Sequence, residues 1–156
     1  MMPKVYVLVG VPGSGKSTWY ANNEELLGDT VYASTDHFVD LEAKRQGKTY
    51  NDVFKDYMPT AVKLMAEVVR TARDLNMDIV WDQTSTTVKS RAKKFRMLPD
   101  YEAVAVVFNT PSPLELEKRL ASRPGKNIPW AVMNTMINGF EMPTLEEGFK
   151  EVIVVE

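Results

Sequence analysis

A glycine-rich stretch near the N-terminus combines the residue types that bind phosphate groups. Residues 10–17, GVPGSGKS, match the pattern G-x-x-x-x-G-K-[ST] at every fixed position. Glycines let backbone N–H groups point at an anion, and the N-terminus of a following helix adds partial positive charge. The Lys16 ammonium can reach β- and γ-phosphates, and the Ser17 hydroxyl can ligate Mg²⁺. The stretch predicts an ATP·Mg²⁺ site contacted by Gly10, Pro12, Gly13, Ser14, Gly15, Lys16, Ser17 and Thr18.

Two aspartates follow predicted strands and are candidate catalytic groups. Asp36 comes shortly after residues 30–33, and Asp82 comes directly after residues 78–81. Ligands bind at the edge of a sheet where parallel strands have their carboxyl ends. There Asp36 could take the proton of an acceptor hydroxyl, and Asp82 could hold Mg²⁺ through water or orient a basic residue. A helix N-cap at Asp36 and a cap or turn at Asp82 are the alternatives that the spacing leaves open.

The basic segment 118–126, KRLASRPGK, lies between two predicted helices. In a small kinase, a lid near residues 119–128 would close over ATP and exclude water. Arg123 and Arg119 suit the charge on a transferring phosphoryl group, because a guanidinium stays protonated and donates in a fixed fork. The alternative is a solvated helix end, where the macrodipole favours cations.

Two further features invite a catalytic interpretation less strongly. A second basic cluster follows Asp82 and could meet the phosphates of a polymer, although a solvated helix face is the interpretation we favour. The single histidine, His37, stands beside Asp36, and packing or capping is its favoured role. The cluster comprises Lys89, Arg91, Lys93, Lys94 and Arg96.

Apolar runs alternate with amphipathic segments along the chain. Strands are predicted at 5–9, 30–33, 78–81, 103–108 and 151–155, and helices at about 16–27, 88–97, 111–122 and from Pro129. Another helix carries an apolar stripe from Phe54 to Ala72 and starts or kinks at Pro59, after a polar segment that turns at residues 46–48. The order predicts one α/β domain over 1–156. Its fold would be that of a nucleotide-kinase-like P-loop NTPase: a sheet of four to five parallel strands, helices on both faces and a lid.

Composition places the chain among ordinary globular proteins. It has 156 residues, of which 44% are hydrophobic and 26% charged, and no cysteine, so disulfides and thiolate chemistry are excluded. No apolar run is long enough to span a bilayer, and we expect no membrane partner and a cytoplasmic protein. The net charge of −2 means that any contact with nucleic acid has to be local.

The sequence resembles the kinase domain of polynucleotide 5′-hydroxyl kinases, both the phage kind and the animal end-repair kind. Residues 10–19, GVPGSGKSTW, are similar to the phage loop almost letter for letter, and Asp36, Asp82 and Arg123 fall where the family has its general base, its Asp-Thr-Asn-like element and its lid arginine. The tail is the most specific match. Ile128-Pro129, Met133 and residues 140–149, FEMPTLEEGF, closely resemble the ending of the animal enzymes, so the resemblance covers nearly the whole chain.

The sequence departs from this family at two places near the acceptor. Gln83-Thr84 follows Asp82 in place of Thr-Asn, and Val39 stands where the phage enzyme has an arginine that contacts the 3′-phosphate of the acceptor. Related phage kinases phosphorylate hydroxymethylated pyrimidines within DNA, which needs the same donor site and base with another acceptor groove. A small-molecule or nucleoside kinase, with a closed apolar acceptor pocket, is a further alternative. A switch ATPase would need a water-positioning glutamate or glutamine that does not stand out.

The resemblance implies an ATP- and Mg²⁺-dependent kinase that acts on a hydroxyl of a nucleic acid, foremost a polynucleotide 5′-hydroxyl, with DNA favoured over RNA. Lys16 and Ser17 would position ATP·Mg²⁺, and Asp36 would take the proton of the acceptor. Arg123, with Arg119, would stabilise the transition state, while Asp82 would orient Arg123 or the metal shell.

Overall fold

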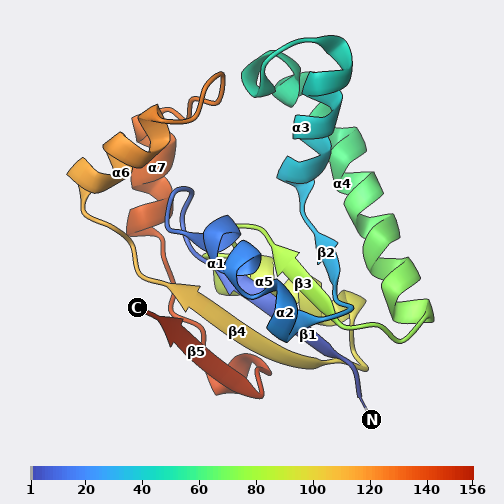
Figure 1. Cartoon of the computed structure of the whole chain (residues 1–156). Helices are drawn as coiled ribbons and strands as arrows, with labels where there is room; N and C mark the ends of the chain where they lie inside the picture. The colour runs from blue at the N-terminus through green and yellow to red at the C-terminus, as the bar shows by residue number, and fades with distance from the viewer. Residues whose placement is uncertain (1) are drawn as a thin grey trace.

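The computed structural model describes residues 2–156 and contains one five-stranded parallel sheet (Figure 1). Its strands lie in the order β2-β3-β1-β4-β5, so the first strand of the chain is central. Their bounds are β1 Lys4–Val9, β2 Val31–Ala33, β3 Ile79–Asp82, β4 Glu102–Phe108 and β5 Glu151–Val155. All strand pairs are parallel, so the carboxyl ends of the strands share one edge. The predicted α/β class and strand number are confirmed.

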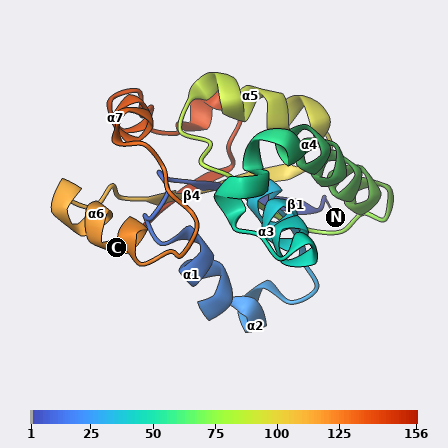
Figure 2. The same cartoon turned by 90° about the horizontal axis from the view of Figure 1, so that it is seen from above.

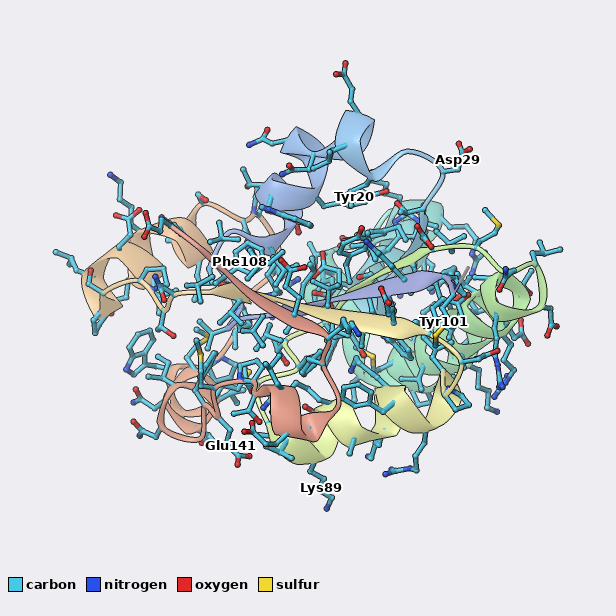
Figure 3. The ribbon with its side chains drawn as sticks, turned by 90° about the horizontal axis from the view of Figure 1, so that it is seen from below. Tyr20, Asp29, Lys89, Tyr101, Phe108 and Glu141 are labelled. Carbon is cyan, nitrogen blue, oxygen red and sulfur yellow. The ribbon has the colours of Figure 1, made fainter. Side chains whose placement is uncertain are left out.

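Helices cover both faces of the sheet, because the strands are apolar on both sides (Figure 2). On one face, Met65 and Val69 of a long helix pack with Leu98 against β1, β3 and β4. On the other, Leu27 and Trp19 pack against Leu8 and its neighbours; in Figure 3, Tyr20 and Phe108 mark this side. The helices are α1 Lys16–Asn22, α2 Glu24–Leu27, α3 Thr35–Gln46, α4 Tyr50–Asp74, α5 Val88–Met97, α6 Pro113–Ala121 and α7 Trp130–Asn138, with a 3₁₀ turn at Leu145–Glu147.

Two local predictions about helices were wrong, and one of the two alternatives at Pro59, a helix start, is excluded. The helix expected over 16–27 is interrupted at Asn23, whose side chain donates to Trp19 O at 2.7 Å. The segment read as polar forms α3, because Thr35, Val39 and Ala43 recur at four-residue spacing and are buried. The long helix begins at Tyr50 rather than at Pro59, since Thr49 and Asp52 form a capping box there.

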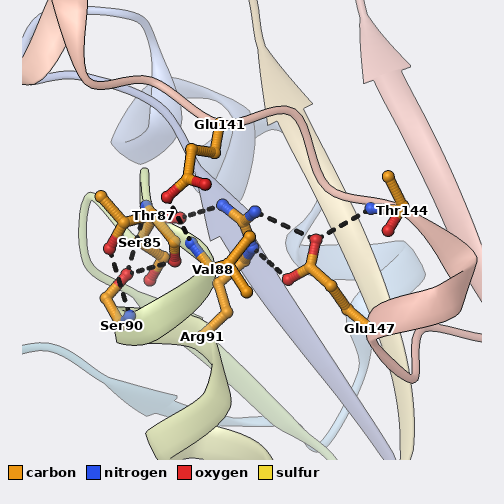
Figure 4. Close-up of polar contacts among 8 residues, drawn as sticks. All are labelled: Ser85, Thr87, Val88, Ser90, Arg91, Glu141, Thr144 and Glu147. Carbon is orange, nitrogen blue, oxygen red and sulfur yellow. Dashed lines mark hydrogen bonds and ion pairs between the residues drawn. The ribbon is translucent and has the colours of Figure 1, made fainter.

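The basic cluster of α5 is not simply a solvated face. Lys89, Lys93 and Arg96 are exposed, and Figure 3 shows Lys89 pointing outward. Arg91, however, is 0% exposed and forms a two-pronged ion pair with Glu147, at 2.8 and 3.0 Å, while also donating to Ser85 O (Figure 4). Its charge therefore fastens the C-terminal segment to α5 and is not available to a polymer.

Within residues 2–156, no helix combines the length and apolar character needed to cross a membrane.

Candidate functional site

The carboxyl edge of the sheet brings three of the predicted segments together. Leu8 of β1 pairs in register with Asp82 of β3, and Ala33 of β2 pairs with Trp81. The phosphate-binding loop after β1, the residues after β2 and Asp82 therefore lie side by side. The loop between α6 and α7, residues 122–129, reaches over the same edge (Figures 1 and 2).

The loop at residues 10–17 has the backbone of a phosphate cradle. Gly13 and Gly15 adopt positive φ of 83° and 105°, which favours glycine, and α1 begins at Lys16. At Gly10 a Cβ would lie 2.4 Å from Ser14 Oγ and 3.0 Å from Phe108 Cβ, so a side chain there would force its neighbours to shift. A Cβ on Gly15 would meet no atom within 4 Å, so the cradle is open at that point.

Lys16 is held at the mouth of this loop. Its Nζ donates to Gly10 O at 2.9 Å and to Val11 O at 3.1 Å, which leaves the third ammonium proton for a phosphate. Burial lowers the pKa of Lys16 to about 8, although the carboxylates of Asp82 and Asp36 oppose that shift. An anion placed beside Lys16 would therefore stabilise the charged form of its ammonium group.

The cradle fits a nucleotide phosphate and its Mg²⁺. The hydroxyl of Ser14 is buried without a hydrogen-bond partner, so a polar ligand at the loop has a donor to meet. Ser17 is exposed at the start of α1. Among residues 2–156, no three acidic or histidine side chains gather as a metal cage, and Mg²⁺ bound through phosphates needs one or two protein ligands. Ser17 and Asp82 can provide them.

Asp82 is 8% exposed. One of its predicted roles was to orient Arg123, but the side chain that hydrogen-bonds to Asp82 is a tyrosine. The Tyr32 hydroxyl donates a hydrogen bond to Asp82 Oδ2. Burial raises the pKa of Asp82, and the hydrogen bond from Tyr32 and the charge of Lys16 work against that. The metal-shell role remains a prediction.

Asp36 lies in the first turn of α3 but does not cap it. The cap is Ser34, whose side chain accepts from His37 N at 3.3 Å, so the carboxylate of Asp36 is free for other partners. The Tyr50 hydroxyl donates to Oδ1 at 2.6 Å, and Lys126 Nζ lies 2.8 Å from Oδ2. Burial opposes ionisation, yet Lys126 and Tyr50 outweigh it and lower the pKa of Asp36. The side chain is 51% exposed, so an ionised carboxylate faces the space beside the loop.

The α6–α7 loop is fastened to the start of α4 by one asparagine. The backbone N–H of Asn51 donates to Gly125 O at 2.9 Å, and its side chain exchanges two hydrogen bonds with the backbone of Asn127, at 3.0 and 3.1 Å. Gly125 has a φ of 71°, and a Cβ there would lie 2.5 Å from that of Thr49. The α6–α7 loop can therefore pack this closely against the start of α4 only with glycine at position 125.

The two predicted arginines differ in their contacts. Arg119 Nη1 donates to Gly13 O at 2.9 Å, so α6 touches the phosphate-binding loop directly. Arg123 is partly exposed, and its charge contributes to lowering the pKa of Lys16. Arg119 therefore contacts the donor side directly, and the role of Arg123 stays a prediction.

Near the acceptor side, His37 is exposed with its ring edge-on to that of Tyr32. Val39, by contrast, is 0% exposed and packs with Val53 and Ala61. Val39 therefore contributes to the packing of α3 against α4.

Sequence reasoning missed four residues of the site: Tyr32, Tyr50, Asn51 and Lys126. Their partners are distant in the chain; Lys126 and Asp36 are 90 residues apart. The spacing of Thr49 and Asp52, which marks a helix start, could have placed Tyr50 and Asn51 in the first turn of α4. No pattern in the sequence pairs them with Asp36 or Asn127.

A family model described as an AAA domain matches residues 5–143. A bifunctional polynucleotide phosphatase/kinase from Schizosaccharomyces pombe is 26% identical in an alignment of 154 positions that covers 96% of this chain. The chain spans 32% of the length of that relative.

Solved structures share the fold. A candidate kinase from Chloroflexus aurantiacus has a TM-score of 0.75 at 16% identity, covering 99% of this chain and 88% of that one. A chain in the Pnkp1/Rnl/Hen1 RNA repair complex has a TM-score of 0.70 at 23% identity, covering 88% of this chain and 44% of that one. At these identities the likeness concerns the arrangement of the elements.

Proposed function

Because the chain belongs to this AAA-domain family of P-loop kinases, we propose that it transfers the γ-phosphate of ATP to a hydroxyl of a nucleic acid, foremost a polynucleotide 5′-hydroxyl. One observation carries the proposal. An ionised, half-exposed carboxylate, Asp36, stands at the same sheet edge as the phosphate-binding loop, and it is not used as the cap of its own helix.

The chemistry follows from the roles of these side chains. Asp36 accepts the proton of the acceptor hydroxyl, and the freed oxygen bonds to the γ-phosphorus as the bond to the β–γ bridging oxygen breaks and ADP departs. Lys16 and the loop amides hold the phosphates in line. Arg119 and Arg123 neutralise the charge that develops on the transferring group.

Mg²⁺ would bind at Ser17 and, directly or through water, at Asp82. When bound, it neutralises charge on the β- and γ-phosphates. Tyr32 fixes the orientation of the Asp82 carboxylate through their hydrogen bond. The lid of the proposed enzyme is the α6–α7 loop, which excludes water from the edge of the sheet.

A second candidate acceptor is the hydroxymethyl group of 5-hydroxymethyluracil within DNA. Val39 supports it, because an apolar side chain at that position of α3 offers no cation for the 3′-phosphate of a terminal nucleotide. For either acceptor we favour DNA over RNA.

The test is transfer of label from γ-labelled ATP·Mg²⁺ to a panel of acceptors. The panel holds 5′-hydroxyl DNA and RNA oligonucleotides, a 5′-blocked DNA duplex with hydroxymethyluracil, and free nucleosides. We expect label on the 5′-hydroxyl oligonucleotides. Label confined to the modified duplex would move the acceptor to the base, and label on nucleosides alone would contradict a nucleic-acid acceptor.

A matched pair of variants tests the role of Asp36 in the same assay. Asp36→Asn should leave ATP binding intact and lower turnover by about 10²–10⁴-fold, the usual contribution of a general base. Asp74→Asn removes an exposed carboxylate at the C-terminal end of α4 and should retain turnover. Wild-type turnover in Asp36→Asn would exclude the general-base role.

A further inference from the structure

The α6–α7 loop connects the two halves of the proposed site. Just before it, Arg119 donates to Gly13 O at 2.9 Å, in the phosphate-binding loop. Within it, Lys126 Nζ lies 2.8 Å from Asp36 Oδ2, on the acceptor side. One short segment thus reaches from the donor cradle to the carboxylate, and displacement of the loop would remove Lys126 from Asp36.

Lys126 is held where it is by several contacts besides the ion pair. Its Nζ lies 4.3 Å from the centroid of the Tyr50 ring, a cation–π contact, and the same tyrosine donates to the other oxygen of Asp36. The side chain of Lys126 is 15% exposed. On either side of it, Gly125 and Asn127 are fixed to Asn51. The ammonium is therefore ordered as part of the seated loop.

The carboxylate retains room for an acceptor. A carboxylate has about four lone-pair sites, and Tyr50 and Lys126 use one on each oxygen. The remaining lone pairs and the half-exposed surface of the side chain can accept a hydroxyl proton. The contacts thus fix the plane of the carboxylate without blocking it.

We propose that Lys126 is a positioning residue for phosphoryl transfer, which holds the Asp36 carboxylate ionised and oriented while the α6–α7 loop is seated on α4. The inference rests on the proposed function, because it assigns Asp36 as the base. The α6–α7 loop would then close over the nucleotide and place Lys126 beside the base in the same movement, since both depend on this loop.

Five charged or polar groups face Asp36, one of them on its own helix. Lys126 of the loop and Lys16 of the phosphate cradle favour its ionised form, and the Tyr50 hydroxyl of α4 does so through its hydrogen bond. Asp40 on α3 and Asp82 on β3 are the facing anions. Removing Lys126 deletes the largest of the favourable contributions, so the pKa of Asp36 should rise.

The experiment compares Lys126→Met, Lys126→Arg and a control, Lys118→Met, which removes an exposed lysine of α6. The first measurement is the ¹³C NMR titration of the Asp36 carboxyl in the full chain, which needs no acceptor. The second is the pH profile of kcat for label transfer. We expect Lys126→Met to move both the titration and the acid limb of kcat to higher pH. It should also lower kcat about tenfold with KM for ATP unchanged. Lys126→Arg should restore most of the wild-type titration of Asp36 and most of the wild-type kcat. Lys118→Met should match the wild type in both measurements.

Unchanged titration of Asp36 in Lys126→Met, or wild-type kcat with an unmoved acid limb, would overturn the inference. The acceptor proposal fails separately, if no nucleic acid takes label. The same profiles would then be recorded with whichever acceptor does take label, or with water through ATP hydrolysis, so the role of Lys126 is still decided.

Discussion

At the scale of single residues, Lys16 is the group whose protonation matters most for the nucleotide. Burial holds its pKa at about 8 in the free protein, and phosphate anions beside it would raise that value. Binding of ATP should therefore take up a proton when the pH is above about 8. Below that pH, Lys16 is already charged and this contribution is flat.

We expect the affinity for ATP to fall as pH rises above about 8, by at most tenfold per pH unit. Calorimetry in two buffers of different protonation enthalpy measures the uptake. Lys94 provides the control, because burial also lowers its pKa to about 8 although it lies over Trp81, away from the cradle. Lys94→Met should keep the uptake, and an affinity that is constant from pH 7 to 9.5 would contradict the assignment.

The sequence predicts donor residues far better than acceptor residues. Residues 10–17 are contiguous, so their spacing alone indicates a cradle, and the structure gives it the expected strand and helix. The partners of Asp36 and Asp82 come from α4, β2 and the α6–α7 loop. Those pairs exist through tertiary packing, which single-sequence periodicity does not encode.

At the scale of elements, the seat of the α6–α7 loop on α4 depends on Asn51. Its side chain supplies two hydrogen bonds to the backbone of Asn127, each worth about 1 kcal/mol. Asn51→Ala should therefore speed hydrogen exchange at the Asn127 amide by about tenfold. Asn134→Ala, an exposed position on α7, is the control, and equal exchange in both variants would show that the side chain does not hold the loop.

A substitution at Gly125 tests the same contact between the α6–α7 loop and α4 from the loop. An alanine would have to adopt a φ of 71° and would meet Thr49 Cβ at 2.5 Å. Gly125→Ala should unseat the loop and lower kcat, while the stability of the sheet stays within about 1–3 kcal/mol of the wild type. Denaturant unfolding and the label-transfer assay measure the two quantities. Wild-type turnover in this variant would mean that a close seat is not needed.

Elements were predicted well where the apolar pattern is strong and less well where it is sparse. The strands are continuous apolar runs, and their boundaries agree with the structure to within a residue or two. Helix α3 carries three buried positions in a polar background, too few to stand out. Pro59 lies inside α4 because Ala61, Met65 and Val69 bury a stripe that outweighs the lost hydrogen bond.

At the scale of the whole molecule, the ion pair of Arg91 and Glu147 fastens the C-terminal segment to α5 (Figure 4). Breaking a buried pair leaves one charge unpaired, which typically costs about 3–5 kcal/mol. Arg91→Met should lower the free energy of unfolding by that order, measured in urea. Lys89→Met, on the exposed side of the same helix, should change it by less than about 0.5 kcal/mol. Equal stability of the two variants would contradict a structural role for the pair.

The strand order also constrains how this chain is made on the ribosome. β1 is the centre of the sheet, yet its neighbours begin at Ile79 and Glu102, so a nascent chain carries the apolar run of β1 long before either partner has been translated. Unpaired strands of this kind are prone to aggregate. Translation that stalls before residue 108 would therefore leave one side of β1 open, and chaperone capture during synthesis should concentrate on chains of that length.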